Sequence, residues 1–374
     1  MKWLLCAALA AAAVSTPALA APVTAKPVMD CPLRDAPFSA KSPLIDLLLS
    51  PAARGVVEQE LGPIFDKMPA NFAGTTPPSF AAILTVRETG RFRPMTPETL
   101  AKIDAALAAL PVTDADKVAR CARYDNDVPQ IASSKGKPRV LLFEKINGFR
   151  DGPSVDAAHA AFMAMAKRKG WEIVATEKGG AFNPATLGKF DAVIWNNISG
   201  DVLTLAQRAA FQQWLTRGGA FIGVHGSAGD PVYFWDWYAD GLIGGRFAGH
   251  PMNPQFQEAR IALADPTHPI AKGLPREWTM TDEWYSFRTN PRAAGAHVIA
   301  TLDEASYKPD GMAGQNLRMG SDHPLVWTNC VGKGRMFYSA IGHRPEMYSD
   351  PRYVTMLESA VSWATGKQAC VKGK

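Results

Sequence analysis

The second half of the chain is built from short apolar runs that are bounded by glycine, proline or polar residues. These runs are rich in Val, Ile, Leu and Phe and are short for helices, which favours buried β-strands. We expect strands at residues 139–146, 171–177, 190–197, 220–225, 258–264, 297–303, 324–330 and 334–343.

In the segments that connect the first four of these strands, the apolar positions recur with the period of a helix. Helical spacing covers 154–170, with Ser154 as the expected N-cap, and 204–219, which ends in two glycines. A last helix is expected over 353–366. Strands that alternate with helices usually pair in parallel and are covered on both faces. Residues 139–368 therefore predict an α/β domain with a mostly parallel sheet and helices on both faces.

The first part of the chain has a different pattern. An extended leader at 21–42, rich in Pro, Ala and Lys, is followed by helical periodicity over 43–123. Thr96 is the expected N-cap of one of these helices. A polar segment with two prolines at 124–138 is typical of a linker. We expect a small helical domain ahead of the α/β domain.

Residues 1–20 have the features of a secretory signal peptide. Lys2 precedes an apolar run from Leu4 to Val14, and the segment ends in Ala-Leu-Ala at Ala20, which suits signal cleavage. The run is too short to span a bilayer, and a retained N-terminal anchor is the alternative. We expect the mature chain to be exported, periplasmic or secreted, without membrane insertion.

Loss of the signal peptide would leave four of the five cysteines. An even number in an oxidising compartment suggests disulfides. The pairing of Cys31 with Cys121 and of Cys330 with Cys370 closes each bridge within one expected domain. A free reactive thiol is the alternative reading.

Charge and motifs exclude several classes of ligand. The formal net charge of +5 becomes +4 when the single lysine of the signal is removed (5 − 1), and it is spread along the chain. We therefore expect no nucleic-acid partner and no membrane surface. The chain has no glycine-rich nucleotide motif, so a nucleotide site lacks support.

Polar residues follow three of the expected strands at their carboxyl ends. Asn197, Ser199 and Asp201 follow one strand, His225 ends the next in "GGAFIGVHGSAGD", and His343 ends a late one. In α/β sheets, the functional crevice lies at the carboxyl ends of the strands. We therefore expect these side chains to meet at one rim, with the histidines as candidates for proton transfer or metal binding.

The segment "TMTDEWYSF" adds carboxylates to this set. If it is extended, Glu283 and Tyr285 point to one face, and Asp282 and Trp284 point to the other. Glu283 and Tyr285 would then offer a base and a hydroxyl donor to the crevice, and Asp282 would orient the loop. An edge strand whose acids face water is the alternative.

A dense aromatic segment, "DPVYFWDWYADGLIGGRFAGHP", follows His225. Its flat rings, Trp235 and Trp237 among them, suit the apolar faces of a sugar, whereas a satellite core under a long loop is the alternative. The segment ends in glycine before His250, which we count with the functional histidines. His323 precedes a proline and is either a buried structural residue or a ligand contact.

Together these motifs resemble the ThuA-like family, which is named for trehalose utilisation. The resemblance implies a flavodoxin-like fold of the class I glutamine amidotransferase-like type. "WNNISGD", "HPIAKGLP", "DEWYSF" and "HPLVWTNCVGKGRMFYSAIGH" carry the resemblance with the two glycine-rich segments quoted above, from about Val140 to Gly366. The resemblance implies a role in the catabolism of trehalose-like disaccharides and their 3-keto derivatives. The sequence departs from the family at Asp151, where a histidine is usual, and retains Ser154. Carried over residue by residue, the motif points to His225, His250, Asp282, Glu283, Tyr285, His323 and His343.

Amidotransferase relatives have a cysteine nucleophile where this chain has His225, which excludes thioester chemistry at that position. An imidazole there can transfer protons near neutral pH or bind a metal. The leading hypothesis is an exported carbohydrate-active hydrolase or lyase, in which His225, His343 and Glu283 transfer protons and Tyr285 assists. The residues expected to bind the small carbohydrate ligand are Asn197, Ser199, Asp201, Trp235, Trp237, His250, Asp282 and His323.

Two alternatives remain. The sequence requires no cofactor, but His225, His250, His343 and Glu283 are a set of ligands that suits zinc or manganese. In the other alternative the protein is a periplasmic sugar-binding or adaptor module whose crevice binds without breaking a bond.

Overall fold

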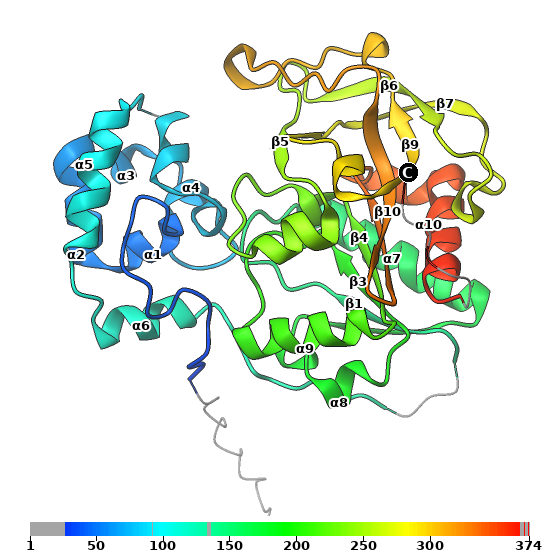
Figure 1. Ribbon diagram of the computed structural model, residues 1–374, viewed down its shortest axis with the longest axis horizontal. Helices are drawn as coiled ribbons and strands as arrows, with labels where there is room; N and C mark the ends of the chain where they lie inside the picture. Colours follow the sequence, from blue (N-terminus) through cyan, green and yellow to red (C-terminus); the bar gives the residue numbers. More distant parts are fainter. Residues whose placement is uncertain (1–26, 92, 133–135, 367–369, 371–372, 374) are drawn as a thin grey trace, which may run out of the picture.

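The computed structural model describes residues 27–91, 93–132, 136–366, 370 and 373 of the 374-residue chain. The expected signal peptide lies outside the described residues. Figure 1 shows a group of helices from the first part of the chain, in blue and cyan, beside a larger α/β unit in green to red. Within the described ranges, no helix has the length and apolar character needed to cross a membrane.

Nine strands form one mixed sheet in the order β2-β1-β3-β4-β11-β10-β9-β6-β7, and helices pack beside it, so the predicted α/β fold is confirmed. The strands from β2 to β11 in this order are parallel, and those from β11 to β7 are antiparallel. A separate small sheet pairs β5 with β8. The strands are β1 (Arg139–Phe143), β2 (Glu172–Thr176), β3 (Ala192–Asn196), β4 (Ala220–Val224), β5 (Phe247–Gly249), β6 (Phe256–Leu263), β7 (Glu277–Glu283), β8 (Ser286–Phe287), β9 (His297–Leu302), β10 (His323–Val331) and β11 (Gly334–Ser339).

Connections between strands explain the two halves of the sheet. β1, β2, β3 and β4 are joined by α7 (Gly152–Lys169), α8 (Pro184–Leu187) and α9 (Leu205–Thr216), which return the chain to the amino ends of the strands. β10 and β11 are joined only by a two-residue turn at 332–333, so they form an antiparallel hairpin. The final helix, α10 (Pro351–Ala364), packs on β4 and β11.

The amino end of α7 differs from the prediction. Its N-cap is Asp151, whose side chain accepts a hydrogen bond from the Ser154 amide at 3.3 Å, so the assignment of this cap to Ser154 is wrong. Pro153 lies in the first turn, where its missing N–H costs no hydrogen bond. The Ser154 hydroxyl instead contacts the Asp151 carboxylate and the carbonyl oxygen of His343.

The first part of the chain folds into short helices around a core of its own, which includes Leu44, Leu47, Val57 and Ile103. The helical segment that begins at 44 breaks at Pro51 into two helices. Thr96 accepts a hydrogen bond from the Thr99 amide at 3.2 Å, so its prediction as an N-cap is confirmed. The α-helices are α1 (Leu44–Leu49), α2 (Pro51–Leu61), α3 (Ile64–Lys67), α4 (Ala70–Ala73), α5 (Pro97–Ala108) and α6 (Asp114–Cys121).

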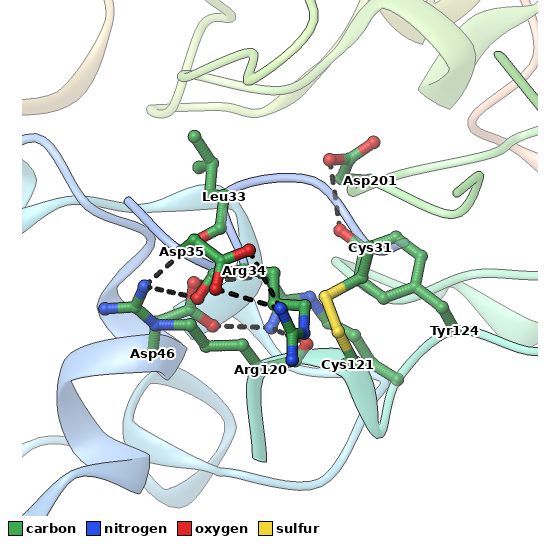
Figure 2. The surroundings of a disulfide bond; sticks show 10 residues. Cys31, Leu33, Arg34, Asp35, Asp46, Arg120, Cys121, Tyr124 and Asp201 are labelled. Carbon is green, nitrogen blue, oxygen red and sulfur yellow. Dashed lines mark hydrogen bonds and ion pairs between the residues drawn. A yellow bond between two sulfur atoms is a disulfide. The ribbon is translucent and has the colours of Figure 1, made fainter. Parts of the chain in front are cut away.

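Both predicted disulfides are confirmed. The Cα atoms are 5.3 Å apart in Cys31–Cys121 and 5.8 Å apart in Cys330–Cys370. Figure 2 shows the first bridge beside Arg120, whose guanidinium donates to three backbone carbonyls of the segment that follows Cys31. Two disulfides are typical of proteins in oxidising compartments.

Specific contacts fix the helical unit against the α/β unit. The Tyr124 hydroxyl donates to Asp201 at 3.1 Å (Figure 2), and the Ser79 amide donates to the carbonyl oxygen of Asn147 at 3.0 Å. Gly148 leaves room for the helical unit, because a Cβ at this position would lie 2.7 Å from the Cγ2 atom of Ile83. The two units therefore share a close-packed junction next to the carboxyl end of β1.

Candidate active site

His225 and Asn197 end two adjacent parallel strands in unusual backbone conformations. His225 follows β4 with φ 34°, and Asn197 follows β3 with φ 54°. The Asn197 side-chain oxygen accepts a hydrogen bond from the Gly226 amide at 3.1 Å, which ties the two turns together. Residues other than glycine in this left-handed region are strained and occur mainly at functional sites. Both turns therefore stand out as candidates for function.

Glu283, the last residue of β7, lies among three imidazoles. Its Oε2 atom is 2.9 Å from Nδ1 of His343 and 3.3 Å from Nε2 of His225, and its Oε1 atom is 3.1 Å from Nδ1 of His250. The Gln255 side-chain amide also donates to Oε1. Glu283 is buried, with 1% of its surface exposed. The fold thus brings together the acid and the three histidines that were singled out from separate parts of the sequence.

This cluster shifts the proton affinities of its members. Burial acts to raise the pKa of Glu283, but the contacts with His225 and His343 outweigh burial and hold that pKa well below its usual value. Burial acts to lower the pKa of His343, but the neighbouring Glu283 carboxylate acts to raise it. The effect of Glu283 is larger, so the pKa of His343 lies above its usual value. Glu283 is therefore ionised and favours the protonated form of His343, and its low pKa makes Glu283 a weak general base.

The hydrogen bonds of His225 fix its tautomer. Its Nδ1 atom is 2.8 Å from the carbonyl oxygen of Ala340, which can only accept, so Nδ1 carries the proton. Nε2 is buried without a hydrogen-bond partner among the described residues, because its approach to Glu283 lacks the required geometry. In the neutral ring, Nε2 carries a lone pair that faces the Glu283 carboxylate. A proton or a cation between Nε2 and this carboxylate would interact favourably with both.

Asp282 positions the loop that carries His343. Its two carboxylate oxygens accept hydrogen bonds from the backbone amides of Gly342 at 2.6 Å and Arg344 at 2.9 Å. Asp282 is fully buried and lies on the face of β7 opposite Glu283. Asp151, at the family's usual histidine position, places its Oδ2 atom 3.9 Å from Nε2 of His343.

Tyr285 packs its ring on His225, with ring centroids 4.2 Å apart. Burial raises the pKa of Tyr285 well above its usual value, so the hydroxyl stays protonated and can only donate or accept a hydrogen bond. His323 lies behind Tyr285 in a buried position. Its Nε2 atom is 2.8 Å from the carbonyl oxygen of Tyr285, and its Nδ1 atom is 2.8 Å from Glu304. His323 therefore supports the site from behind.

A cavity of about 510 Å³ lies next to this cluster. Its polar side, called the floor below, consists of His225, His250, Glu283, Tyr285 and His343. Cavities of this size hold small molecules of one or two rings.

The opposite side of the cavity, called the wall below, comes from the helical unit and was not predicted. It consists of Phe72, Phe80, Ile83 and Leu84, and its one polar neighbour from the same unit is Asn71. The wall residues lie in or directly after two short helices, α4 and a 3₁₀ helix at Phe80–Ile83. Each helix has only four residues, which is too short for a period in the sequence to show which way a side chain points.

Five predicted ligand contacts do not line the cavity: Asp201, Trp235, Trp237, Asp282 and His323. Trp235 and Trp237 pack on each other at 5.3 Å between centroids and on Phe211 of α9, so the satellite-core reading of this aromatic segment applies. Asp201 forms an ion pair with Arg208 and joins the two units through Tyr124. These side chains stabilise the fold around the site and do not line it.

Asn197 and Ser199 line the cavity, but their polar groups already have protein partners. The Asn197 amide donates to the Tyr348 hydroxyl at 3.0 Å, and the Ser199 hydroxyl donates to Asp230 at 2.6 Å. Asp230 also lines the cavity and was not predicted. Burial raises the pKa of Asp230 to about 7, despite hydrogen bonds from Ser199 and the Gly200 amide.

The floor has a donor set that fits a divalent cation. One ligand atom each from His225, Glu283 and His343 lies within 4.8 Å of the others. Two imidazoles and a carboxylate are common ligands of zinc and manganese, and the unpartnered Nε2 of His225 is a suitable donor. The fourth predicted ligand, His250, contacts Glu283, but its Nδ1 atom also lies 2.9 Å from the carbonyl oxygen of Pro251.

The fold and site define an α/β domain that carries a histidine at the strand-end turn, flanked by an acid and further histidines. Residues 139–364 match the model of the ThuA family, described as trehalose utilisation, and the chain belongs to this family. The family description points to a role related to sugars. No curated protein matches the chain significantly.

Solved structures that are similar to this chain include two proteins described as ThuA-like. One, from Bacteroides uniformis, has 23% identity and a TM-score of 0.54, and the match covers 66% of this chain and 98% of that protein. The other, from Parabacteroides merdae, has 17% identity and a TM-score of 0.45, with coverage of 62% and 91%.

Proposed function

We propose that the protein is an exported carbohydrate-active enzyme that cleaves a glycoside or 3-keto-glycoside by imidazole acid–base chemistry. The observation that supports this most is the pairing of His225 and His343 across Glu283, with ring centroids 5.1 Å apart. In neutral His225 the Nε2 atom carries a lone pair without a protein donor among the described residues, and Glu283 raises the pKa of His343. The pair can therefore accept and donate a proton at neighbouring atoms of one ligand.

A 3-keto-glycoside suits this pair particularly well. The C3 carbonyl acidifies the hydrogen on C2, and Nε2 of His225 would take that proton. The electrons would form the C1–C2 double bond as the C1–O bond breaks, and His343 would protonate the departing oxygen. The products are an unsaturated keto-sugar and an alcohol, and water can add to the former to complete a net hydrolysis. The Tyr285 hydroxyl would donate a hydrogen bond to an oxygen of the sugar.

Turnover of defined sugars tests this proposal. Purified protein is incubated with trehalose, simple glucosides and their 3-keto forms, and released sugar is measured. His225→Asn should lower kcat by about 100-fold or more while the fold is retained, because asparagine tolerates a left-handed backbone. His343→Gln should have a similar effect. His159→Gln is the matched control, since His159 pairs with Glu144 outside the cavity and should leave kcat unchanged. Absence of turnover with every sugar would contradict the proposal.

The donor set on the floor favours a metal-dependent form of the same site as a second candidate. In that form His225, His343 and Glu283 would hold a zinc or manganese ion, which would polarise an oxygen of the ligand. Metal analysis of protein purified without a histidine tag tests this. Less than a tenth of an equivalent per chain, with no rise in Tm on adding either ion, would exclude it.

A non-catalytic sugar-binding or adaptor module is distinguished by the same variants. A binder would keep its ligand affinity in His225→Asn and show no turnover in the unsubstituted protein. Export through residues 1–20 is tested by locating the chain with and without that segment. Retention of the full-length chain in the cytoplasm would contradict export.

A further inference from the structure

The wall carries a row of aromatic rings that reaches from the helical unit to the floor. Phe72 and Phe80 stack with centroids 4.5 Å apart and planes at 4°. Phe80 stacks in turn on Phe149, from the loop after β1, at 5.0 Å and 28°. Phe149 lies 6.2 Å from the ring of His343, which places the end of the row beside the proton donor.

These rings are incompletely covered by protein. Phe149 is 39% exposed, and Phe72 and Phe80 are half-buried, whereas the neighbouring Ile83 and Leu84 are almost fully buried. All five residues line the cavity. Exposed aromatic rings at the edge of a concave site are a common surface for flat apolar ligands.

The wall is also held in place before any ligand binds. The segment between Phe72 and Phe80 is joined to the α/β unit by the hydrogen bond from Ser79 to Asn147, and Ile83 packs against Gly148. A preformed surface loses little conformational entropy when a ligand binds.

We propose that the wall is a second subsite, which binds an aromatic or other flat apolar group attached to the sugar at its leaving-group side. The inference rests on the proposed function for the identity of the sugar end. The departing oxygen must lie at His343, and the group bonded to that oxygen then lies next to Phe149. A second sugar ring is less suited to this position, because its hydroxyls would meet four apolar residues and only Asn71 as a polar side chain from the helical unit.

Binding of matched glucosides tests the subsite without requiring turnover. Calorimetry compares 4-nitrophenyl and methyl glucosides, in both anomeric forms, with 4-nitrophenol as the probe of the wall alone. The unsubstituted protein should bind a 4-nitrophenyl glucoside about tenfold more tightly than the methyl glucoside of the same anomer. The double variant Phe72→Ala, Phe80→Ala should lose this preference and keep its affinity for the methyl glucoside. Val118→Ala, an exposed position on α6, is the control and should keep the preference.

Phe149→Ala is a second variant, and it should remove the same preference. Because Phe149 belongs to the α/β unit, a folding defect in the helical unit cannot explain that result. Equal affinity for the two glucosides in the unsubstituted protein would overturn the proposal, as would a preference that survives in all the variants or an absence of any binding by 4-nitrophenol. Failure of the proposed function has a different signature. In that case the unsubstituted protein binds 4-nitrophenol and the wall variants do not. Methyl glucosides neither bind to the unsubstituted protein nor react with it.

Discussion

The floor and the wall of the cavity differ in origin and in chemistry. The floor is polar, buried and entirely within residues 139–364, the part that matches the ThuA family. The wall is apolar and comes from the helical unit, which precedes the matched region. The groups that we propose to transfer protons therefore belong to the part that matches the family, and the proposed apolar subsite belongs to the helical unit that precedes it.

The largest expected effect comes from the floor. Glu283→Gln removes the charge that raises the pKa of His343, so that pKa should fall and the proton donor should be lost at lower pH. We expect kcat to fall by about 100-fold or more and the alkaline limb of the pH–rate profile to move to lower pH. Titration of the His343 ring by NMR gives the same information without turnover.

Asp46→Asn is the matched control for that change, because it removes a buried carboxylate of the helical unit that pairs with Arg123. It should lower Tm, since it leaves an uncompensated buried charge, and keep kcat within about twofold. A fall in kcat with Asp46→Asn as large as that with Glu283→Gln would mean that both effects arise from stability.

The sequence predicted the floor better than the wall for a physical reason. The carboxyl ends of the parallel strands β3, β4 and β11 meet at one rim. The alternation of strands and helices in the sequence was therefore enough to predict that Asn197, His225 and His343 lie together. The two-residue period of an extended strand placed Glu283 and Tyr285 on the cavity side. The wall lies in and beside four-residue helices, which are too short to show a period, and its position depends on how two separate cores dock.

Other mismatches also have local causes. Pro153 in the first turn favours Asp151 over Ser154 as the cap of α7, because proline is common at the start of a helix. Among the described residues between β6 and β10, the helices are short 3₁₀ helices and none is an α-helix that could return the chain for parallel pairing, and β6, β9 and β10 pair antiparallel. Aromatic density around Trp235 showed that rings would be buried together, but it could not show on which side of the loop.

A second effect, on stability, sharpens the description of the floor. Asp230 lies at its edge, and burial raises the pKa of this carboxyl from 3.8 to about 7, so the folded protein binds a proton there that the unfolded chain has released. Stability should therefore fall as pH rises from about 4 through 7. Relative to Asp230→Asn, the unsubstituted protein should lose about 2–3 kcal/mol between about pH 5 and pH 8. Urea unfolding of both proteins at the two pH values measures this, and a constant difference would show that Asp230 is ionised throughout.

The smallest effect on activity is expected in the aromatic segment outside the cavity. Trp237→Leu removes a ring that packs on Trp235 and Phe211, so Tm should fall by several degrees while kcat/KM for a 4-nitrophenyl substrate stays within about twofold. Phe72→Leu makes the same kind of change in the wall and should raise KM for that substrate with little change in kcat. The two variants separate aromatic residues that stabilise the fold from those that contact the ligand. A tenfold rise in KM with Trp237→Leu would place the sugar on the aromatic segment and would remove the distinction between wall and satellite core.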